Sequence, residues 1–235
     1  MLNNDANFVV NKWSTYKYLL IDADNTLYEI LNVREIYDKA IRTIFKSDNG
    51  LDFNYSELYD ELKRFARSEL KEYFWVTKPV WFLTVSFLKF FALKSELSNS
   101  DILKKVFKLS QEAYKVFKQE VLKNLRCTKV GANLGKIKRG KTVIVISEEE
   151  KSFLIEKLEA SGVIKFIDYI ISSSDTGYLK PHKKYFTLVK ELYDVDFSKA
   201  LYIDDTEGNL ELARKEFLID VISTNEFESI IQRLV

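Results

Sequence analysis

The second half of the chain alternates short apolar runs with segments of helical periodicity, and this alternation limits the fold more than any other feature. The clearest run, Thr142–Ser147, is β-branched almost throughout and is typical of a strand buried on both faces. A helix is predicted over about residues 149–161, and Gly162 is placed to end it. Because strands separated by helices form a parallel sheet covered on both sides, the sequence predicts an α/β fold with a Rossmann-like parallel core.

The same alternation continues on both sides of this segment. Further strands are predicted at residues 18–22, 166–171, 200–203 and 220–222, and further helices at about residues 185–193 and 209–217. Between the first strand and a glycine-rich segment at 131–140 the periodicity is helical, with helix starts at Asn32, near Asn54 and after a break at residues 98–101. We therefore predict a core domain of residues 1–30 and 126–235, interrupted by an all-helical domain of residues 31–125.

The composition argues against several classes of protein. With 36 basic and 35 acidic residues the net charge is +1, which gives no reason to expect a nucleic acid partner. Cys127 is the only cysteine, so we interpret it as a small buried hydrophobe and expect no internal disulfide and a reducing, cytoplasmic location. His182 is the only histidine, which excludes a metal site built from several histidines.

One aromatic stretch, residues 73–93, raises the question of a membrane span. Lys78, Pro79 and Lys89 interrupt it and leave about ten uncharged residues between the lysines, whereas a spanning helix needs about 20. We interpret the stretch as a buried helix or a contact surface and expect no membrane association. The amino terminus carries Asp5 and only a short apolar patch, so no signal peptide is expected.

Polar side chains gather where the predicted strands end or in the loops beside them. They are Asp22, Asp24, Thr26, Ser147, Lys180, Asp204, Asp205 and Asn209. A parallel sheet brings such residues to one edge, where open α/β folds bind their ligands. Carboxylates suit Mg²⁺, a hydroxyl and an ammonium suit an oxyanion, and a free carboxylate can act as a nucleophile.

In order and spacing these groups resemble the four motifs of the haloacid dehalogenase superfamily, whose most frequent activity is phosphoester hydrolysis. Asp22-Ala-Asp24-Asn-Thr26 resembles the first motif, and residues 143–147 resemble the second. Residues 178–181 resemble the third motif, and residues 201–209 resemble the fourth. The resemblance covers essentially the whole chain and implies that the helical insert corresponds to the family's cap.

The resemblance also implies a role for each residue. Asp22 would attack phosphorus and form an aspartyl-phosphate, and Asp24 would act as general acid and then as general base. Mg²⁺ would be held by Asp22, by the backbone carbonyl of Asp24 and by Asp205. The remaining residues would contact the phosphate or support the site, namely Thr26, Ser147 and Lys180 for the phosphate and Asp204 and Asn209 for support.

The sequence departs from the family pattern in three places. Glu148–Glu150 follow Ser147 where many relatives have Asn, and we expect these acids to point into the first turn of the next helix, whose dipole favours them. His182 and Lys183 replace the proline-containing loop common after the third-motif lysine. Asn209 stands where many relatives have a second acid, although an amide can still bind a water on the metal.

Several activities are compatible with this resemblance. Asp24 argues against a true haloacid dehalogenase, because those enzymes need no acid for a halide and usually lack this residue. The motifs look most like the nucleotidase branch with a helical cap, with a weaker resemblance to pyrimidine 5′-nucleotidases. We expect a Mg²⁺-dependent phosphomonoesterase acting on a small molecule such as a nucleoside monophosphate. A sugar-phosphate or phosphoglycolate phosphatase and a non-catalytic binding or regulatory protein are the alternatives, and the oligomeric state is left open.

Overall fold

The computed structural model describes residues 4–45, 99–180 and 182–235. Its contacts divide the chain into two compact units, residues 1–30 with 125–235 and residues 31–124. The predicted helix start near Asn54 and the aromatic stretch at 73–93 lie outside the described residues. Among the helices that the structure describes, none is long and apolar enough to cross a membrane.

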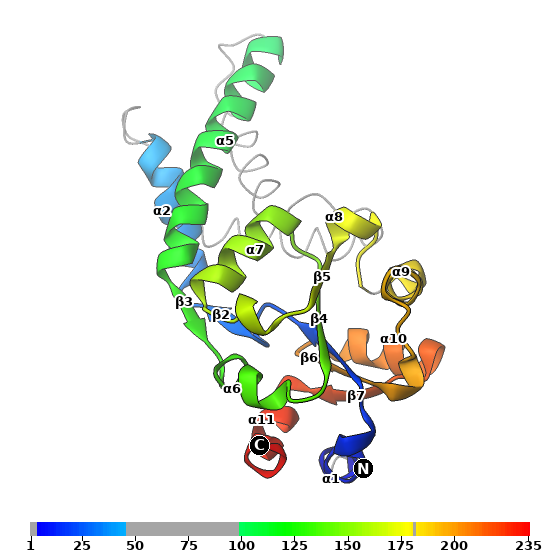
Figure 1. Ribbon diagram of the computed structural model, residues 1–235. Coiled ribbons are helices and arrows are strands. Elements are labelled where there is room, and N and C mark those ends of the chain that lie inside the picture. The colour runs from blue at the N-terminus through cyan, green and yellow to red at the C-terminus, as the bar shows by residue number, and fades with distance from the viewer. Residues whose placement is uncertain (1–3, 46–98, 181) are drawn as a thin grey trace. The chain divides into compact units, whose positions relative to one another are not determined.

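The larger unit is built on a five-stranded parallel sheet with the order β5-β4-β1-β6-β7 (Figure 1). The strands are β1 (Tyr18–Asp22), β4 (Thr142–Ser147), β5 (Tyr169–Ser172), β6 (Ala200–Asp204) and β7 (Asp220–Ser223). β1 lies at the centre and pairs in parallel with β4 on one side and β6 on the other. The predicted fold class is confirmed.

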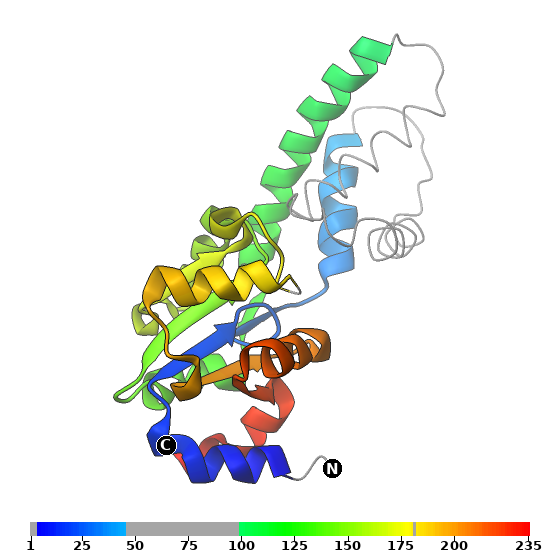
Figure 2. The same ribbon diagram turned by 90° about the vertical axis from the view of Figure 1, so that its right-hand side faces the viewer.

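Helices cover both faces of this sheet (Figures 1 and 2). One face packs against α1 (Asn4–Lys12), α6 (Lys129–Ile137), α7 (Lys151–Ala160) and α11 (Thr224–Leu234). The other face packs against α9 (Lys183–Tyr193) and α10 (Glu207–Phe217). Alternate residues of β1 serve the two faces, because Leu19 and Ile21 join the first core and Leu20 joins the second. Shorter helical segments are η1 (Trp13–Thr15), η2 (Ile164–Phe166), α8 (Ser173–Thr176) and η3 (Phe197–Lys199).

The smaller unit is an insertion whose two ends lie side by side. In the larger unit, β2 (Tyr28–Ile30) pairs in antiparallel fashion with β3 (Leu125–Cys127) at the points where the chain leaves and returns. Within the smaller unit, the backbone N–H of Leu31 donates to the carbonyl of Asn124 at 3.0 Å. Its described elements are both helices, α2 (Val33–Phe45) and α5 (Asn99–Lys123), which contact each other through the rings of Tyr37 and Phe117. That this unit acts as a cap stays a prediction.

Several boundaries differ from the expected ones for identifiable reasons. α7 begins at Lys151 rather than at residue 149, because the Glu150 side chain accepts from the backbone N–H groups of Ser152 at 3.0 Å and Phe153 at 3.2 Å. β5 begins at Tyr169 rather than at residue 166, because η2 takes up the residues before it. The helices α1, α6 and α11 and the short strands β2 and β3 had no counterpart in the sequence prediction.

The glycine-rich segment forms most of α6, and its first glycine is needed for close packing. A Cβ atom at Gly131 would lie 2.2 Å from the backbone oxygen of Leu27 and 2.7 Å from the sulfur of Cys127. Thr128 caps this helix by accepting from the N–H of Gly131 at 3.1 Å, so the backbone cannot easily move away. Cys127 packs against the core, as predicted for a small hydrophobe, but it is half-buried where the sequence predicted a buried residue.

We expect Gly131→Ala to lower the free energy of unfolding by about 1–3 kcal/mol, because the added methyl group meets backbone atoms that must shift. Gly208→Ala is the matched control, since it is also a helical glycine but a Cβ there meets nothing within 4 Å. That variant should be unchanged or more stable by up to about 1 kcal/mol. Urea denaturation of both variants is the measurement, and equal stabilities would contradict the close approach of α6 to Leu27.

Candidate active site

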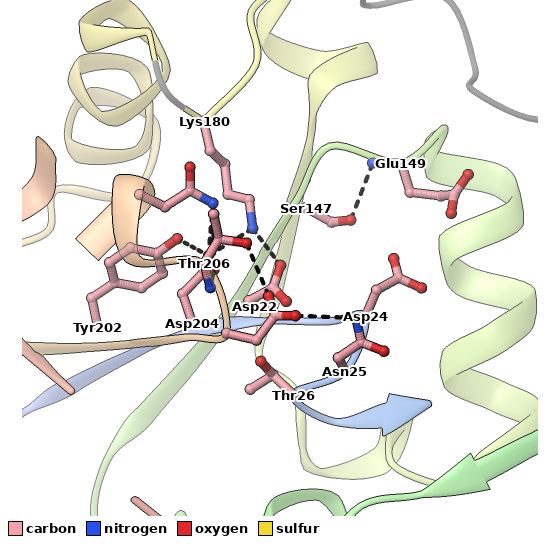
Figure 3. Close-up of polar contacts among 12 residues, drawn as sticks. Asp22, Asp24, Asn25, Thr26, Ser147, Glu149, Lys180, Tyr202, Asp204 and Thr206 are labelled. Atoms are coloured by element: carbon pink, nitrogen blue, oxygen red, sulfur yellow. Dashed lines mark hydrogen bonds and ion pairs between the residues drawn. The ribbon is translucent and has the colours of Figure 1, made fainter. Parts of the chain in front are cut away.

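Three neighbouring strands end in polar residues at one edge of the sheet (Figure 3). Asp22 is the last residue of β1, Ser147 of β4 and Asp204 of β6. The register aligns these ends, because Asp22 lies opposite Ile146 and Ile21 lies opposite Ile203. The carboxyl ends of the strands therefore bring Asp22 together with two residues that lie more than 100 positions later in the sequence.

Lys180 lies between the carboxylates of Asp22 and Asp204 and contacts both. Its ammonium group donates to Asp22 and, at 2.8 Å, to Asp204. All three residues are buried, with 4% of Lys180, 5% of Asp22 and none of Asp204 exposed. A buried charge is tolerated only when it is paired and hydrogen-bonded, and here one cation serves two anions.

Asp204 is the most fully hydrogen-bonded group in the site. One of its oxygens accepts from the backbone N–H of Thr206 at 2.7 Å, and the other accepts from Lys180 and from the hydroxyl of Tyr202. The amide of Asn209 lies 3.2–3.3 Å from both oxygens. Both oxygens of Asp204 are therefore occupied, by Lys180 and by groups of the loop after β6, and the supporting role of Asp204 and Asn209 stays a prediction.

Burial and pairing act on these groups in opposite directions. Burial raises the pKa of Asp22 well above its usual range, and Asp204 adds to this, although Lys180 opposes it. Burial would also raise the pKa of Asp204, but Lys180 and the hydrogen bonds outweigh it and hold that pKa below its usual value. For Lys180 burial favours the neutral amine, yet the nearby carboxylates prevail and keep its pKa well above the ordinary value. Lys180 is therefore a permanent cation beside the end of β1.

Asp205 completes an acidic cluster suited to a divalent cation. Carboxylate oxygens of Asp22, Asp204 and Asp205 all lie within 4.8 Å of one another. When Asp22 is ionised, the three carboxylates and the single ammonium of Lys180 carry two net negative charges, which a doubly charged, oxygen-binding ion such as Mg²⁺ would offset. The exposed Asp205 is oriented by Asn25, which donates to it at 3.0 Å, and by the hydroxyl of Thr206 at 3.1 Å. Participation of the Asp24 carbonyl stays a prediction.

Asp24 lies apart from this cluster. In Figure 3 its carboxylate points away from Asp22, toward the side of the site where Glu149 lies. One oxygen accepts from Lys157 at 2.8 Å, and 38% of the side chain is exposed. The two aspartates of the first motif are thus only two positions apart in the chain, but their carboxylates lie in different surroundings.

Ser147 is buried at the end of β4, and its hydroxyl oxygen accepts from the backbone N–H of Glu149 at 3.1 Å. Tyr185 fixes the same residue through its backbone, since its hydroxyl lies 3.0 Å from both the nitrogen and the carbonyl oxygen of Ser147. Of the three acids that follow, Glu150 caps α7, as expected from the helix dipole. Glu149 instead forms an ion pair with Lys157.

Thr26 does not join the other predicted phosphate ligands. The residue is fully buried, and its hydroxyl lies 2.7 Å from the hydroxyl of Thr224. Its backbone carbonyl accepts from Thr128 at 2.5 Å. The Thr26 hydroxyl therefore already has a partner in the interior, and a contact between Thr26 and a phosphate stays a prediction.

The site also contains residues that the sequence did not single out. Tyr202 has a weak signal, because it is the one residue with a hydroxyl in the apolar run of β6 that precedes Asp204. Lys157 has a clearer one, since it occupies the buried stripe of α7 together with Phe153 and Leu158, where a lysine is unexpected. Asn25 has a positive φ of 60°, a conformation that Asn tolerates better than most residues.

Comparisons with known proteins support the same fold. A sequence model of the haloacid dehalogenase-like hydrolase family matches residues 16–215, whereas a search of curated proteins finds no match. A putative β-phosphoglucomutase from Thermotoga maritima aligns with a TM-score of 0.62 at 15% identity, over 93% of this chain and 100% of that chain. The putative HAD-hydrolase YfnB from Bacillus subtilis, bound to magnesium, aligns with a TM-score of 0.58 at 20% identity, over 88% and 85% of the two chains.

A 2-haloacid dehalogenase from Pseudomonas syringae aligns with a TM-score of 0.58 at 17% identity, over 83% of each chain. At these identities the structural likeness establishes the fold, and it includes relatives with different named activities. The family match is stronger evidence, because it spans most of the sequence and contains the ends of β1, β4 and β6. The chain therefore belongs to the haloacid dehalogenase-like hydrolase family.

Proposed function

We propose that this chain is a Mg²⁺-dependent phosphomonoester hydrolase with Asp22 as the nucleophile and Asp24 as the general acid and base. The observation that carries the proposal is the placement of these two carboxylates. Asp22 is buried against the ammonium of Lys180, whereas Asp24 lies apart and is partly exposed. Two carboxylates in such different surroundings are suited to different tasks.

In the first step an oxygen of Asp22 attacks phosphorus, and the bond from phosphorus to the ester oxygen breaks. Asp24 gives its proton to the departing alkoxide, so an alcohol leaves and an aspartyl-phosphate remains. In-line displacement places the departing oxygen on the side of phosphorus opposite Asp22. An acid that stands apart from the nucleophile, as Asp24 does, suits this geometry.

In the second step water attacks the phosphorus of the aspartyl-phosphate. Asp24, now a carboxylate, accepts a proton from that water, and the bond between phosphorus and the Asp22 oxygen breaks. Inorganic phosphate is released, and both aspartates return to their starting states. Throughout, Lys180 offsets negative charge at Asp22 and at the phosphoryl oxygens, while Asp204 keeps the ammonium in place.

The acidic cluster fits a resident Mg²⁺ ion, for which Asp22 and Asp205 are the available carboxylates because Asp204 is saturated. When bound, the ion would reduce the repulsion between Asp22 and an anionic phosphate and would stabilise charge on the phosphoryl group. The magnesium in the related YfnB structure supports this choice of metal.

We expect Asp205→Asn to weaken Mg²⁺ binding at least about tenfold, because it removes a charged ligand while leaving Lys180 and its two partners intact. Isothermal titration calorimetry measures this effect directly, and the Mg²⁺ concentration that gives half-maximal hydrolysis should rise in parallel. Chelator should abolish hydrolysis by the wild type. Unchanged Mg²⁺ affinity in Asp205→Asn would contradict the assignment of this residue.

Purified protein assayed with Mg²⁺ on a panel of phosphomonoesters tests the proposed function. The panel includes nucleoside monophosphates, sugar phosphates and phosphoglycolate, because the residues at the sheet edge address only the phosphate group and leave the remainder of the substrate open. A 2-haloacid such as 2-chloropropionate is added because a structural relative is a 2-haloacid dehalogenase. Release of phosphate supports the proposal, whereas release of halide, or no turnover with any ester, contradicts it.

A further inference from the structure

Lys157 is a fully buried lysine beside the residue that we propose as the general acid. It projects from α7, and none of its side chain is exposed. Its ammonium group lies 2.8 Å from an oxygen of Asp24 and 2.6 Å from an oxygen of Glu149. Lys157 therefore connects the loop after β1 with the loop after β4, and its two partners differ from the two partners of Lys180.

Aromatic and aliphatic side chains make up the remaining surroundings of the ammonium group, and the phenol of Tyr28 is the polar group among them. The ammonium lies 5.1 Å from the ring centre of Tyr28 and 5.2 Å from that of Phe153, and Leu154 and Leu158 occupy the same buried side of α7. Burial favours the neutral amine, but the two carboxylates outweigh it and keep the pKa of Lys157 well above its ordinary value. The residue is thus a charged group held in the core by two anions.

Stability alone is a weak reason to keep such a group. A well-packed apolar side chain is often as stable as a buried ion pair, and the neighbouring residues of this stripe are apolar. The ion pair does, however, fix the orientation of Asp24. One carboxylate oxygen is held by Lys157, while the other accepts no hydrogen bond from the residues that the structure describes and belongs to a partly exposed side chain.

We propose that Lys157 is a positioning residue that orients Asp24 for proton transfer and neutralises Glu149, which lies close to the anion site. This inference rests on the proposed function of Asp22 and Asp24. The contact through one oxygen leaves the second oxygen of Asp24 to exchange a proton with the departing alkoxide. Pairing with the same ammonium also keeps Glu149 from repelling a bound phosphate, which Glu150 avoids by capping α7.

The test uses esters that differ in how much they need a proton when they leave. Nitrophenolate departs without being protonated, whereas phenolate depends on a proton from the general acid and alkoxides depend on it more strongly. In Lys157→Met we expect kcat/KM to fall about 10- to 100-fold for an alkyl phosphate and less than about threefold for p-nitrophenyl phosphate. kcat/KM is the appropriate quantity, because it reports the step in which the ester bond breaks. A structural defect alone would lower kcat/KM for all esters by the same factor.

Two further variants keep the result interpretable. Glu149→Gln removes the other partner but retains the contact of Lys157 with Asp24, so its dependence on the leaving group should match that of the wild type. If Lys157→Met does not fold, the double variant Lys157→Met/Glu149→Gln removes the orphaned carboxylate and tests the same loss of contact. Asp24→Asn should show the same selective loss as Lys157→Met, but larger.

The outcomes separate this inference from the proposed function. Wild-type hydrolysis of the series with a selective loss in Lys157→Met supports both. Wild-type hydrolysis with an equal loss for every ester overturns the positioning role and leaves the phosphatase function standing. No hydrolysis of any ester by the wild type overturns both.

Discussion

Asp22→Asn should lower phosphomonoester hydrolysis by at least about a thousandfold. The amide that replaces the carboxylate is a poor nucleophile and cannot form the aspartyl-phosphate. Lys180, Asp204 and Tyr202 would keep their mutual contacts, so the rest of the site should be preserved. The measurement is kcat/KM at saturating Mg²⁺ on the best ester of the panel.

Asp220→Asn is the matched control for this variant. It makes the same chemical change at the amino end of β7, where Asp220 pairs with Lys12 at 2.5 Å, far along the sheet from the strand ends that form the site. Its activity should stay within about twofold of the wild type, as expected for a residue outside the site. An Asp22→Asn protein that retains a tenth of the wild-type activity would contradict the role of Asp22.

The Asp22→Asn substitution should not reduce the free energy of unfolding. Because burial raises the pKa of Asp22 in the folded protein, the folded state holds the proton more tightly than the unfolded state does. Ionisation of Asp22 above its unfolded pKa therefore works against folding, and the neutral amide avoids that penalty. In the presence of chelator at neutral pH, thermal unfolding of Asp22→Asn should occur at the same temperature as the wild type or higher. Such a gain is typical of sites in which function opposes stability.

Lys180→Met should have the second large effect, on stability as well as on activity. The substitution leaves Asp22 and Asp204 buried without their shared cation, and loss of one partner of a buried ion pair costs about 3–5 kcal/mol. Hydrolysis should fall by at least about a hundredfold, because positive charge beside the phosphoryl group is lost. Urea denaturation and kcat/KM measure the two effects.

The stability loss in Lys180→Met should depend on pH in a defined direction. Lys180 holds the pKa of Asp204 below its usual value, so in the wild type Asp204 contributes stability that is present above its unfolded pKa and is lost as the pH falls. Without Lys180, the buried carboxylates of Asp22 and Asp204 destabilise the folded state when they are ionised and destabilise it less when they are protonated. The difference in the free energy of unfolding between wild type and Lys180→Met should therefore be largest at pH 7 and should become smaller as the pH falls toward about 4.

A second variant separates charge from packing in this result. Lys180→Met/Asp204→Asn removes one orphaned carboxylate and should regain part of the lost stability without regaining activity. A stability difference that is the same at pH 7 and near pH 4 would contradict the electrostatic explanation.

The strands of the core were predictable because they are buried on both faces. Thr142–Ser147 and Tyr18–Asp22 were predicted with the bounds that the structure has, since a continuous apolar run leaves few alternatives. Their ends then placed Asp22, Ser147 and Asp204 together, because parallel strands share one carboxyl edge. Lys180 was predicted from its motif, yet its double contact with Asp22 and Asp204 depends on the fold of a loop that periodicity does not describe.

Other elements were missed although the sequence contains signals for them. Ser223 and Glu226 form an N-terminal cap of α11, with the Ser223 hydroxyl accepting from the N–H of Glu226, and this spacing marks a helix start. In α6 the glycines conceal the helix, because Gly131 is required by the approach to Leu27 rather than by a turn.

Side-chain direction was the hardest property to predict at the site. Thr26 fits the first motif by position, but the turn after β1 directs its hydroxyl to Thr224 in the interior. Lys157 lies 133 residues from Asp24, and only the packing of α7 against the sheet brings the two together. Motif spacing gives no information about such contacts, because they depend on tertiary packing.

Trapping of the phosphorylated protein tests the nucleophilic role of Asp22 most directly. Protein is mixed with Mg²⁺ and a phosphomonoester labelled in its phosphoryl group, quenched in acid within milliseconds, digested and analysed by mass spectrometry. We predict label on the peptide that contains Asp22, removal of that label by hydroxylamine, and no label in Asp22→Asn. Rapid release of phosphate without a labelled protein, or label on a different residue, would contradict the role of Asp22 as the nucleophile.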